Sequence, residues 1–168
     1  MYMVALSGEN AEEYFKTMDN EIQILMRRDT WDIFLRESIS DHNVLPGTWS
    51  FKCKRKPDWT IRKFKAQYCV RGTVQKRLSP EPLSSYSPVV QWATVRLVLI
   101  FQYILGLQSQ SINFTNAFAQ ADIPSGGPVF SELSRYYNSD VVQCDFVLRL
   151  NKILCGHAKA ARLWYEKL

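Results

Sequence analysis

The chain has 168 residues, of which 46% are hydrophobic and 13% aromatic, enough for one compact domain or two small lobes that share a core. This composition excludes a disordered chain, and no apolar run approaches the ~20 residues that a membrane-spanning helix needs. The N-terminal segment has neither a basic leader nor a cleavage pattern, so we expect an intracellular protein, cytoplasmic or nuclear, with no membrane association.

The net charge of +5 is unevenly distributed along the chain. Residues 1–50 carry 4 Lys/Arg against 9 Asp/Glu, residues 51–77 carry 10 against 1, and residues 78–168 carry 7 against 6. The basic character therefore lies in one segment.

The first 50 residues predict a helix, a strand and a turn. A capping box at residues 10–13 precedes apolar residues at helical spacing, which predicts an amphipathic helix that ends at Arg27 and Arg28. Residues 31–35 are expected to form a short strand, and residues 41–47 have the composition of a polar turn.

Residues 51–65 contain two alternating runs joined by residues 56–59, which predicts a β-hairpin with a Pro-Asp turn. Because side chains alternate along a strand, Lys52, Lys54 and Lys56 share one face. A narrow ribbon with so many cations repels itself unless an anion neutralises it, and phosphates are the natural partner. The alternative is a solvated edge hairpin that resists aggregation.

The remainder of the chain predicts an α+β arrangement. The apolar run 94–105 stops at Gly106, which predicts a largely buried helix. A strand is expected over 107–114, running into a short helical turn at 116–118. The other expected segments are a loop over 72–87, a break at 123–128, strands at 129–130 and 146–150 around a polar loop at 134–143, and a helix over 159–167.

The chain has four cysteines that lie far apart in the sequence without a C-x-x-C pair: Cys53, Cys69, Cys144 and Cys155. Only two histidines are available to join them, so a zinc site is disfavoured. Without an export signal, the thiols are expected to be free.

Several short motifs follow one another along nearly the whole chain. They are Thr30-Trp31, Trp49-Ser50-Phe51-Lys52-Cys53-Lys54, the run from Lys65 to Gln75, Tyr86-Ser87-Pro88-Val89-Val90 with Thr94-Val95-Arg96, Asn116-Ala117-Phe118, and Gly156 with Arg162-Leu163-Trp164-Tyr165. This ordered series resembles the reverse transcriptase of Ty1/copia-type retrotransposons. The order of the motifs is far more specific than any one of them alone.

The resemblance implies an α+β fold in the form of a partial right-hand polymerase, with an antiparallel sheet and packed helices. Residues 1–106 and 124–150 would belong to the fingers, and residues 107–123 and 151–168 to the palm. The chain ends before the family's Tyr-x-Asp-Asp hairpin, so the rest of the palm and the thumb would be absent. A domain truncated in this way is expected to be marginally stable.

The resemblance also implies a chemistry, the transfer of a nucleotide from a dNTP to a primer 3′ hydroxyl with two Mg²⁺ ions. It places Asn113 at the position of the family's first catalytic Asp. An amide brings no negative charge, and the chain contains no Asp-Asp pair. We therefore expect no intact metal site, no Mg²⁺ bound by this chain, and no polymerase activity.

Binding residues follow from the same resemblance. The candidate nucleotide-binding residues are Arg62, Lys65, Phe118 and Gly156. The candidates for contact with an RNA template and a DNA primer are Lys52, Lys54, Arg55, Lys56, Lys63 and Arg71. In the family an aromatic at the position of Phe118 lies under the sugar and rejects a 2′ hydroxyl, and the alternative for this residue is plain core packing.

Three departures from the family pattern weaken the expected nucleotide pocket: Gln67 replaces Arg, Cys155 replaces Tyr and Ala161 replaces Pro.

The resemblance and the departures from it leave two function classes open. One is a piece of a copia-type RNA-directed DNA polymerase whose complete form copies RNA into DNA. The other is a non-catalytic remnant or domesticated module that binds nucleic acid through the basic segment 51–77.

Overall fold

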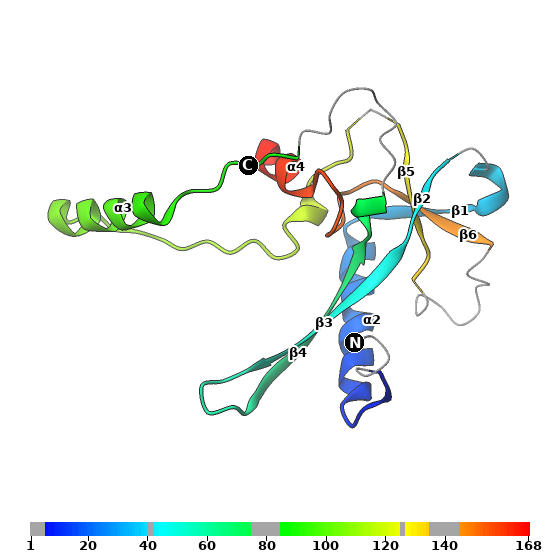
Figure 1. Ribbon diagram of the computed structural model, residues 1–168, viewed down its shortest axis with the longest axis horizontal. Helices are drawn as coiled ribbons and strands as arrows, with labels where there is room; N and C mark the ends of the chain where they lie inside the picture. The colour runs from blue at the N-terminus through cyan, green and yellow to red at the C-terminus, as the bar shows by residue number, and fades with distance from the viewer. Residues whose placement is uncertain (1–5, 40–41, 75–84, 125–126, 135–144) are drawn as a thin grey trace.

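The computed structural model describes residues 6–39, 42–74, 85–124, 127–134 and 145–168. Helices and strands are mixed along the chain (Figure 1). The elements are α2 (Ala11–Arg27), β1 (Trp31–Leu35), η1 (Arg36–Ile39), β2 (Val44–Leu45), β3 (Gly47–Arg55), β4 (Ile61–Val70), η2 (Gly72–Val74), α3 (Trp92–Leu105), η3 (Phe118–Gln120), β5 (Val129–Glu132), β6 (Phe146–Leu150) and α4 (Ala160–Lys167). Among the described residues, no helix is both long and apolar enough to cross a membrane.

The strands form two sheets. One has four strands in the order β1-β6-β5-β2, and the other is the β3-β4 hairpin. The β1-β6, β5-β6 and β3-β4 pairs are antiparallel, as expected, whereas β2 and β5 are parallel. Parallel pairing needs a long crossover, and the chain between β2 and β5 contains the hairpin and α3.

The main apolar core joins α2, the base of the hairpin and the four-stranded sheet. Tyr68 of β4 lies at its centre, with its ring 5.3 Å from that of Trp49 and 6.3 Å from that of Trp31. Its hydroxyl donates to the carbonyl of Glu132 in β5 at 2.6 Å, and Trp49 Nε1 donates to Ser134 Oγ at 3.0 Å. These contacts fix the base of the hairpin to the sheet, and its distal half projects from the body (Figure 1).

Most elements expected from periodicity are present, and the strand predictions at 31–35 and 146–150 match β1 and β6. The capping-box prediction is wrong, because Asn10 makes no side-chain cap hydrogen bond. Its φ of -103° and ψ of 19° depart from the extended conformation in which such a side chain reaches the first turn. The turn expected at 41–47 contains β2, since Val44–Leu45 pairs with β5 and Leu45 is buried.

Helix α3 and the segment after it differ most from expectation. The helix stops at Gly106, as predicted, and Gly106 has a left-handed conformation, but the predicted burial is wrong because no residue of α3 is buried. Nine of its large apolar side chains are between 50% and 89% exposed, Val95 is partly exposed, and the helix projects away from the rest of the chain (Figure 1). Because its apolar residues face all directions, the sequence pattern is that of a buried helix, yet no described element covers it. Residues 107–114 form no strand, so the strand predicted for this segment is wrong.

Candidate nucleotide pocket and nucleic-acid interface

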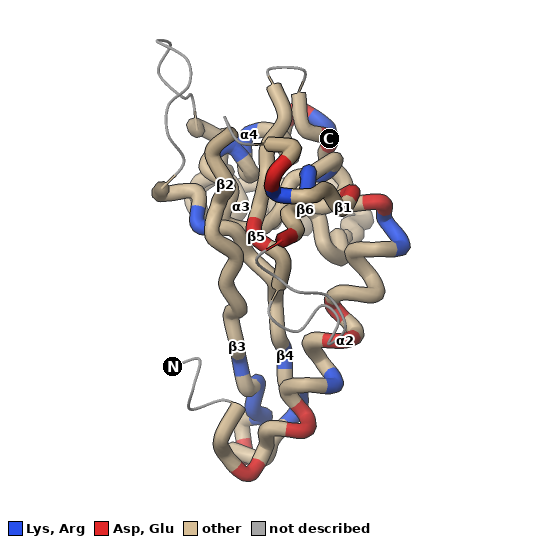
Figure 2. Tube along the Cα trace, turned by 90° about the vertical axis from the view of Figure 1, so that its right-hand side faces the viewer, with Lys and Arg blue, Asp and Glu red and all other residues tan. Residues whose placement is uncertain are grey.

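Four lysines lie in two cross-strand pairs on one face of the β3-β4 hairpin. The register sets Lys52 opposite Lys65 and Lys54 opposite Lys63. Lys65 is half-buried and the other three are exposed. Figure 2 shows Lys and Arg positions gathered on the distal half of the hairpin. None of the four forms an ion pair with a described residue, although the charge of Lys65 interacts with the carboxyl group of Glu21, so this lysine face (Lys52, Lys54, Lys63, Lys65) is predominantly positive.

The other face of the hairpin packs against α2. The ring of Tyr14 lies 5.1 Å from Phe51 and 4.9 Å from Phe64 in edge-to-face geometry. Because side chains alternate along each strand, this apolar contact leaves Lys52, Lys54 and Lys63 on the exposed face, whereas Lys65 lies beside Glu21 of α2. Packing on α2 thus decides which side of the hairpin meets solvent.

The other basic candidates have different surroundings. Arg55 donates to the carbonyl of Trp59 at 2.9 Å, so its guanidinium takes part in the turn. Arg62 lies where the register shifts, and it has no partner across the hairpin. Lys56 is exposed in the turn, whereas Arg71 follows β4 at the opposite end of the hairpin. The structure therefore groups the lysines and leaves Arg71 apart from them.

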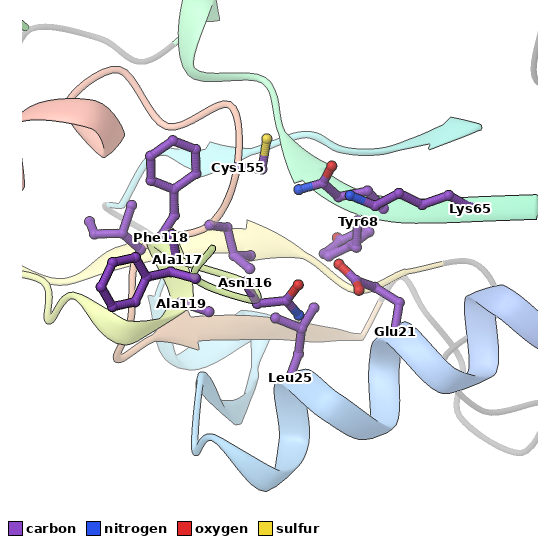
Figure 3. Close-up of a pocket in the computed structure, with 13 residues that line it drawn as sticks. Glu21, Leu25, Lys65, Tyr68, Asn116, Ala117, Phe118, Ala119 and Cys155 are labelled. Carbon is purple, nitrogen blue, oxygen red and sulfur yellow. The ribbon is translucent and has the colours of Figure 1, made fainter. Parts of the chain in front are cut away.

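A pocket of about 180 Å³ opens beside β4, where three other parts of the chain meet this strand (Figure 3). It contains two of the four candidate nucleotide-binding residues, Lys65 and Phe118, and lacks Arg62 and Gly156. Its lining comprises Glu21 and Leu25 of α2, Lys65, Gln67 and Tyr68 of β4, residues 114 and 116–119, and residues 153–155.

Glu21 is the acidic group of this pocket, and sequence reasoning missed it. Its buried position raises the pKa of the carboxyl group, while Asn116, Lys65 and the backbone N–H of Tyr68 oppose this rise. Asn116 lies beside it with a buried Nδ2 that makes no hydrogen bond of ordinary geometry to a described residue (Figure 3). The sequence offered one sign that Glu21 is buried: its helical position places it on the apolar stripe of α2 together with Met18.

The edge of β4 that faces the pocket is covered by other elements. The N–H of Tyr68 donates to Glu21, that of Val70 to the carbonyl of Cys155 at 2.9 Å, and that of Gly72 to the carbonyl of Gly156 at 3.1 Å. Gly156 has a φ of 86°, and a Cβ there would lie 2.1 Å from the carbonyl oxygen of Val70. Gly156 thus allows two backbone segments to approach closely.

The surroundings of Phe118 are compatible both with contact to a nucleotide sugar and with core packing, the two alternatives that the sequence left open. It lines the pocket, and it also packs against the buried residues Ala121, Ile153 and Ala160.

Asn113 lies on the exposed segment between α3 and η3, outside the lining of the pocket. Within the described ranges, no group of three or more His, Cys, Asp or Glu side chains could hold a metal ion. Mg²⁺ requires several oxygen ligands, usually including carboxylates, and Asn113 supplies a neutral amide. Asn113 therefore does not supply the anionic ligand that the resemblance implies at this position.

Comparison with known proteins gives one family. The family model for reverse transcriptase (RNA-dependent DNA polymerase) matches residues 28–168. The chain is 26% identical over 162 residues to the retrovirus-related Pol polyprotein from transposon TNT 1-94 of Nicotiana tabacum, covering 96% of this chain and 12% of the relative. It is 24% identical over 164 residues to the Pol polyprotein from transposon RE1 of Arabidopsis thaliana, covering 98% and 11%.

An uncharacterized mitochondrial protein of Arabidopsis thaliana is 33% identical over 99 residues, which is 59% of this chain and 56% of that protein. No solved structure matches the chain. The chain spans only 11–12% of the length of the two Pol polyproteins named above. The match over residues 28–168 and the similarity to these polyproteins show that the chain belongs to the reverse transcriptase (RNA-dependent DNA polymerase) family, in its Ty1/copia type.

Proposed function

We propose that this chain binds the backbone of an RNA–DNA primer-template through the lysine face of the hairpin and does not extend the primer. The observation that carries the proposal is the pairing of Lys52 with Lys65 and of Lys54 with Lys63. Like charges that face one another across a ladder destabilise it. Phosphates placed against the lysine face would remove that repulsion and release counterions, which favours binding.

The proposed binding is independent of base sequence. Lysine ammonium groups act as point charges toward phosphates, and sequence is read by groups that reach the base edges. The four lysines come from two adjacent strands, so they form a two-row cationic strip rather than a single point of contact. Such a strip fixes the position of a backbone without choosing a sequence.

Three features support the absence of catalysis. The pocket volume of about 180 Å³ is below the roughly 300 Å³ at which ligand sites usually begin. Glu21 adds a carboxyl group beside Lys65, which disfavours a triphosphate when ionised, and Gln67 brings no positive charge. Asn113 brings no anionic ligand, and losing a carboxylate from a metal site costs the transition state several kcal/mol.

Within this proposal, residues 1–106 and 124–150 correspond to fingers and residues 107–123 and 151–168 to palm. The packing of Tyr14 on Phe51 and Phe64 supports placing α2 and the hairpin in one unit. The pocket would then lie at the junction between the two parts, because β4 meets residues 114–119 and 153–155 there.

The binding half is tested with a labelled RNA–DNA hybrid, whose affinity is measured by fluorescence anisotropy at several salt concentrations. Replacing Lys52, Lys54 and Lys63 together with glutamine should lower the slope of log K against log salt by about 2–3, at roughly 0.7–0.9 for each phosphate contact. A matched triple variant at Lys152, Lys159 and Lys167 removes the same charge elsewhere. Equal slopes in the two variants would contradict binding by the lysine face.

The catalytic half is tested by primer extension with the purified chain, using Mg²⁺ and, separately, Mn²⁺. We expect no templated addition of nucleotides with either ion. Incorporation that follows the template sequence would overturn the proposal that the chain is inactive, whatever the result of the binding experiment.

A further inference from the structure

Cys69 and Cys155 are far apart in the sequence and directly opposed in the structure. They are partners in a parallel β-bridge, and backbone hydrogen bonds from Val70 to Cys155 at 2.9 Å and from Gly72 to Gly156 at 3.1 Å flank them. Chains paired in this way lie about 4.8 Å apart, within the roughly 4.4–6.8 Å Cα separation of disulfides. Both thiols are free and half-buried.

The surroundings of the pair make the two thiols unequal. Hydrogen bonding between them lowers the pKa of Cys155 and raises that of Cys69. Burial and the charge of Glu21 oppose the Cys155 thiolate, whereas the charge of Lys65 and the backbone N–H of Gly156 favour it. Because the thiolate is the reactive form, Cys155 is the better nucleophile of the two.

We propose that Cys69 and Cys155 are a reversible redox pair that a low-molecular-weight disulfide oxidises to an intrachain disulfide. In the first step the Cys155 thiolate attacks one sulfur of the small disulfide and releases one thiolate, leaving a mixed disulfide on Cys155. The Cys69 thiol then gives its proton to solvent and attacks the Cys155 sulfur, releasing a second small thiolate. Two protein thiols are oxidised by two electrons, and the small disulfide is reduced to two thiols.

The position of the pair gives the cross-link a structural consequence. Cys155 lines the pocket, and the bond would join β4, which carries Lys65, to the segment that leads into α4. Oxidation would lock the edge of β4 against that segment. The pair does not depend on nucleic-acid binding, because neither cysteine belongs to the lysine face.

The test uses the full chain and oxidised glutathione as the probe, followed by alkylation, digestion and mass spectrometry. We expect the loss of two free thiols, with Cys69 linked to Cys155. The same reaction in concentrated urea should favour Cys144 with Cys155, which are much closer along the chain, because short loops close more easily. A Cys69–Cys155 link that is no more abundant in the folded chain would overturn the proposal.

Single variants test the order of attack. Cys69→Ser should retain a mixed disulfide with glutathione on Cys155, because the second thiol is missing. The matched control Cys53→Ser, in the hairpin, should form the cross-link as the original chain does. A Cys69→Ser chain whose Cys155 stays unmodified would overturn Cys155 as the nucleophile, and the comparison of folded and unfolded chain decides the pair even where this variant does not fold.

Discussion

Replacing Gly156 with alanine should destabilise the fold by about 2–5 kcal/mol. The left-handed φ of 86° costs a residue with a Cβ roughly 1–2 kcal/mol. The new Cβ would lie 2.1 Å from the Val70 carbonyl oxygen, so the two backbones must separate. Their separation weakens the hydrogen bonds from Val70 to Cys155 and from Gly72 to Gly156, each worth about 0.5–1.5 kcal/mol.

Alanine variants of two other glycines separate the conformational cost of Gly156→Ala from its steric cost. Gly106 has a φ of 62°, but a Cβ there meets no atom within 4 Å, so Gly106→Ala carries the conformational cost alone. That cost falls on the end of α3, which no described element covers, and the global loss should be about 1 kcal/mol or less. Gly72→Ala carries the steric cost, because its Cβ would lie 2.4 Å from the Gly156 carbonyl oxygen.

The measurement is urea unfolding followed by tryptophan fluorescence and circular dichroism. Gly156→Ala and Gly72→Ala should lower the midpoint strongly at an unchanged m-value, and Gly106→Ala should lower it little. If Gly156→Ala cost no more than Gly106→Ala, the close approach at β4 would not contribute to stability. A Gly156→Ala chain with full stability and altered nucleotide affinity would instead support the nucleotide-binding role that the motif suggested.

Three further predictions concern titration and exposure. Burial raises the pKa of Glu21 in the folded chain, so the protonated carboxyl group stabilises the fold below the unfolded pKa, and this stabilisation is lost as pH rises through the folded pKa. In Glu21→Gln, the urea midpoint should no longer fall over this pH range. Burial and Lys159 lower the pKa of His157, so its contribution is lost as pH falls; His157→Asn, which can still accept the Lys159 N–H, should remove that dependence. Leu97 and Ile104 are exposed apolar side chains of α3, and exposed apolar surface favours self-association. Replacing both with lysine should reduce any self-association seen in sedimentation experiments. It should change the free energy of unfolding by less than about 0.5 kcal/mol, because neither side chain is buried.

Local sequence patterns were sufficient for β1, β6 and the hairpin, but they missed β2 and predicted a strand over 107–114 that does not form. Alternation and the Pro-Asp turn predicted the β3-β4 hairpin, and turn composition placed its reversal between Arg55 and Ile61. The same alternation predicted a shared face for Lys52 and Lys54. It did not give their partners, because the register depends on the turn and on the bulge at Arg62, and the opposition of Lys52 to Lys65 appears only in three dimensions.

Interactions between distant segments were beyond the sequence patterns. The spacing of apolar residues predicted a helix over 94–105. Whether such a helix is buried depends on what packs against it, and no described element covers α3. The Cys69–Cys155 pair gave no signal, because the spacing rules for cysteines describe metal sites and redox motifs that are local in the sequence.

Asn113 illustrates the difference between a position in a motif and a position in space. The motif series assigns it to the first metal-binding carboxylate, and the structure puts it on an exposed segment outside the pocket, with no cluster of metal-binding side chains among the described residues. Asn113→Asp would restore one charge in that segment. A single exposed carboxylate leaves Mg²⁺ mostly hydrated, because the ion gives up its water reluctantly and needs further ligands to hold it in place. We therefore expect Asn113→Asp alone to leave the chain without a Mg²⁺ site, and primer extension with the Asn113→Asp chain should still give no templated product.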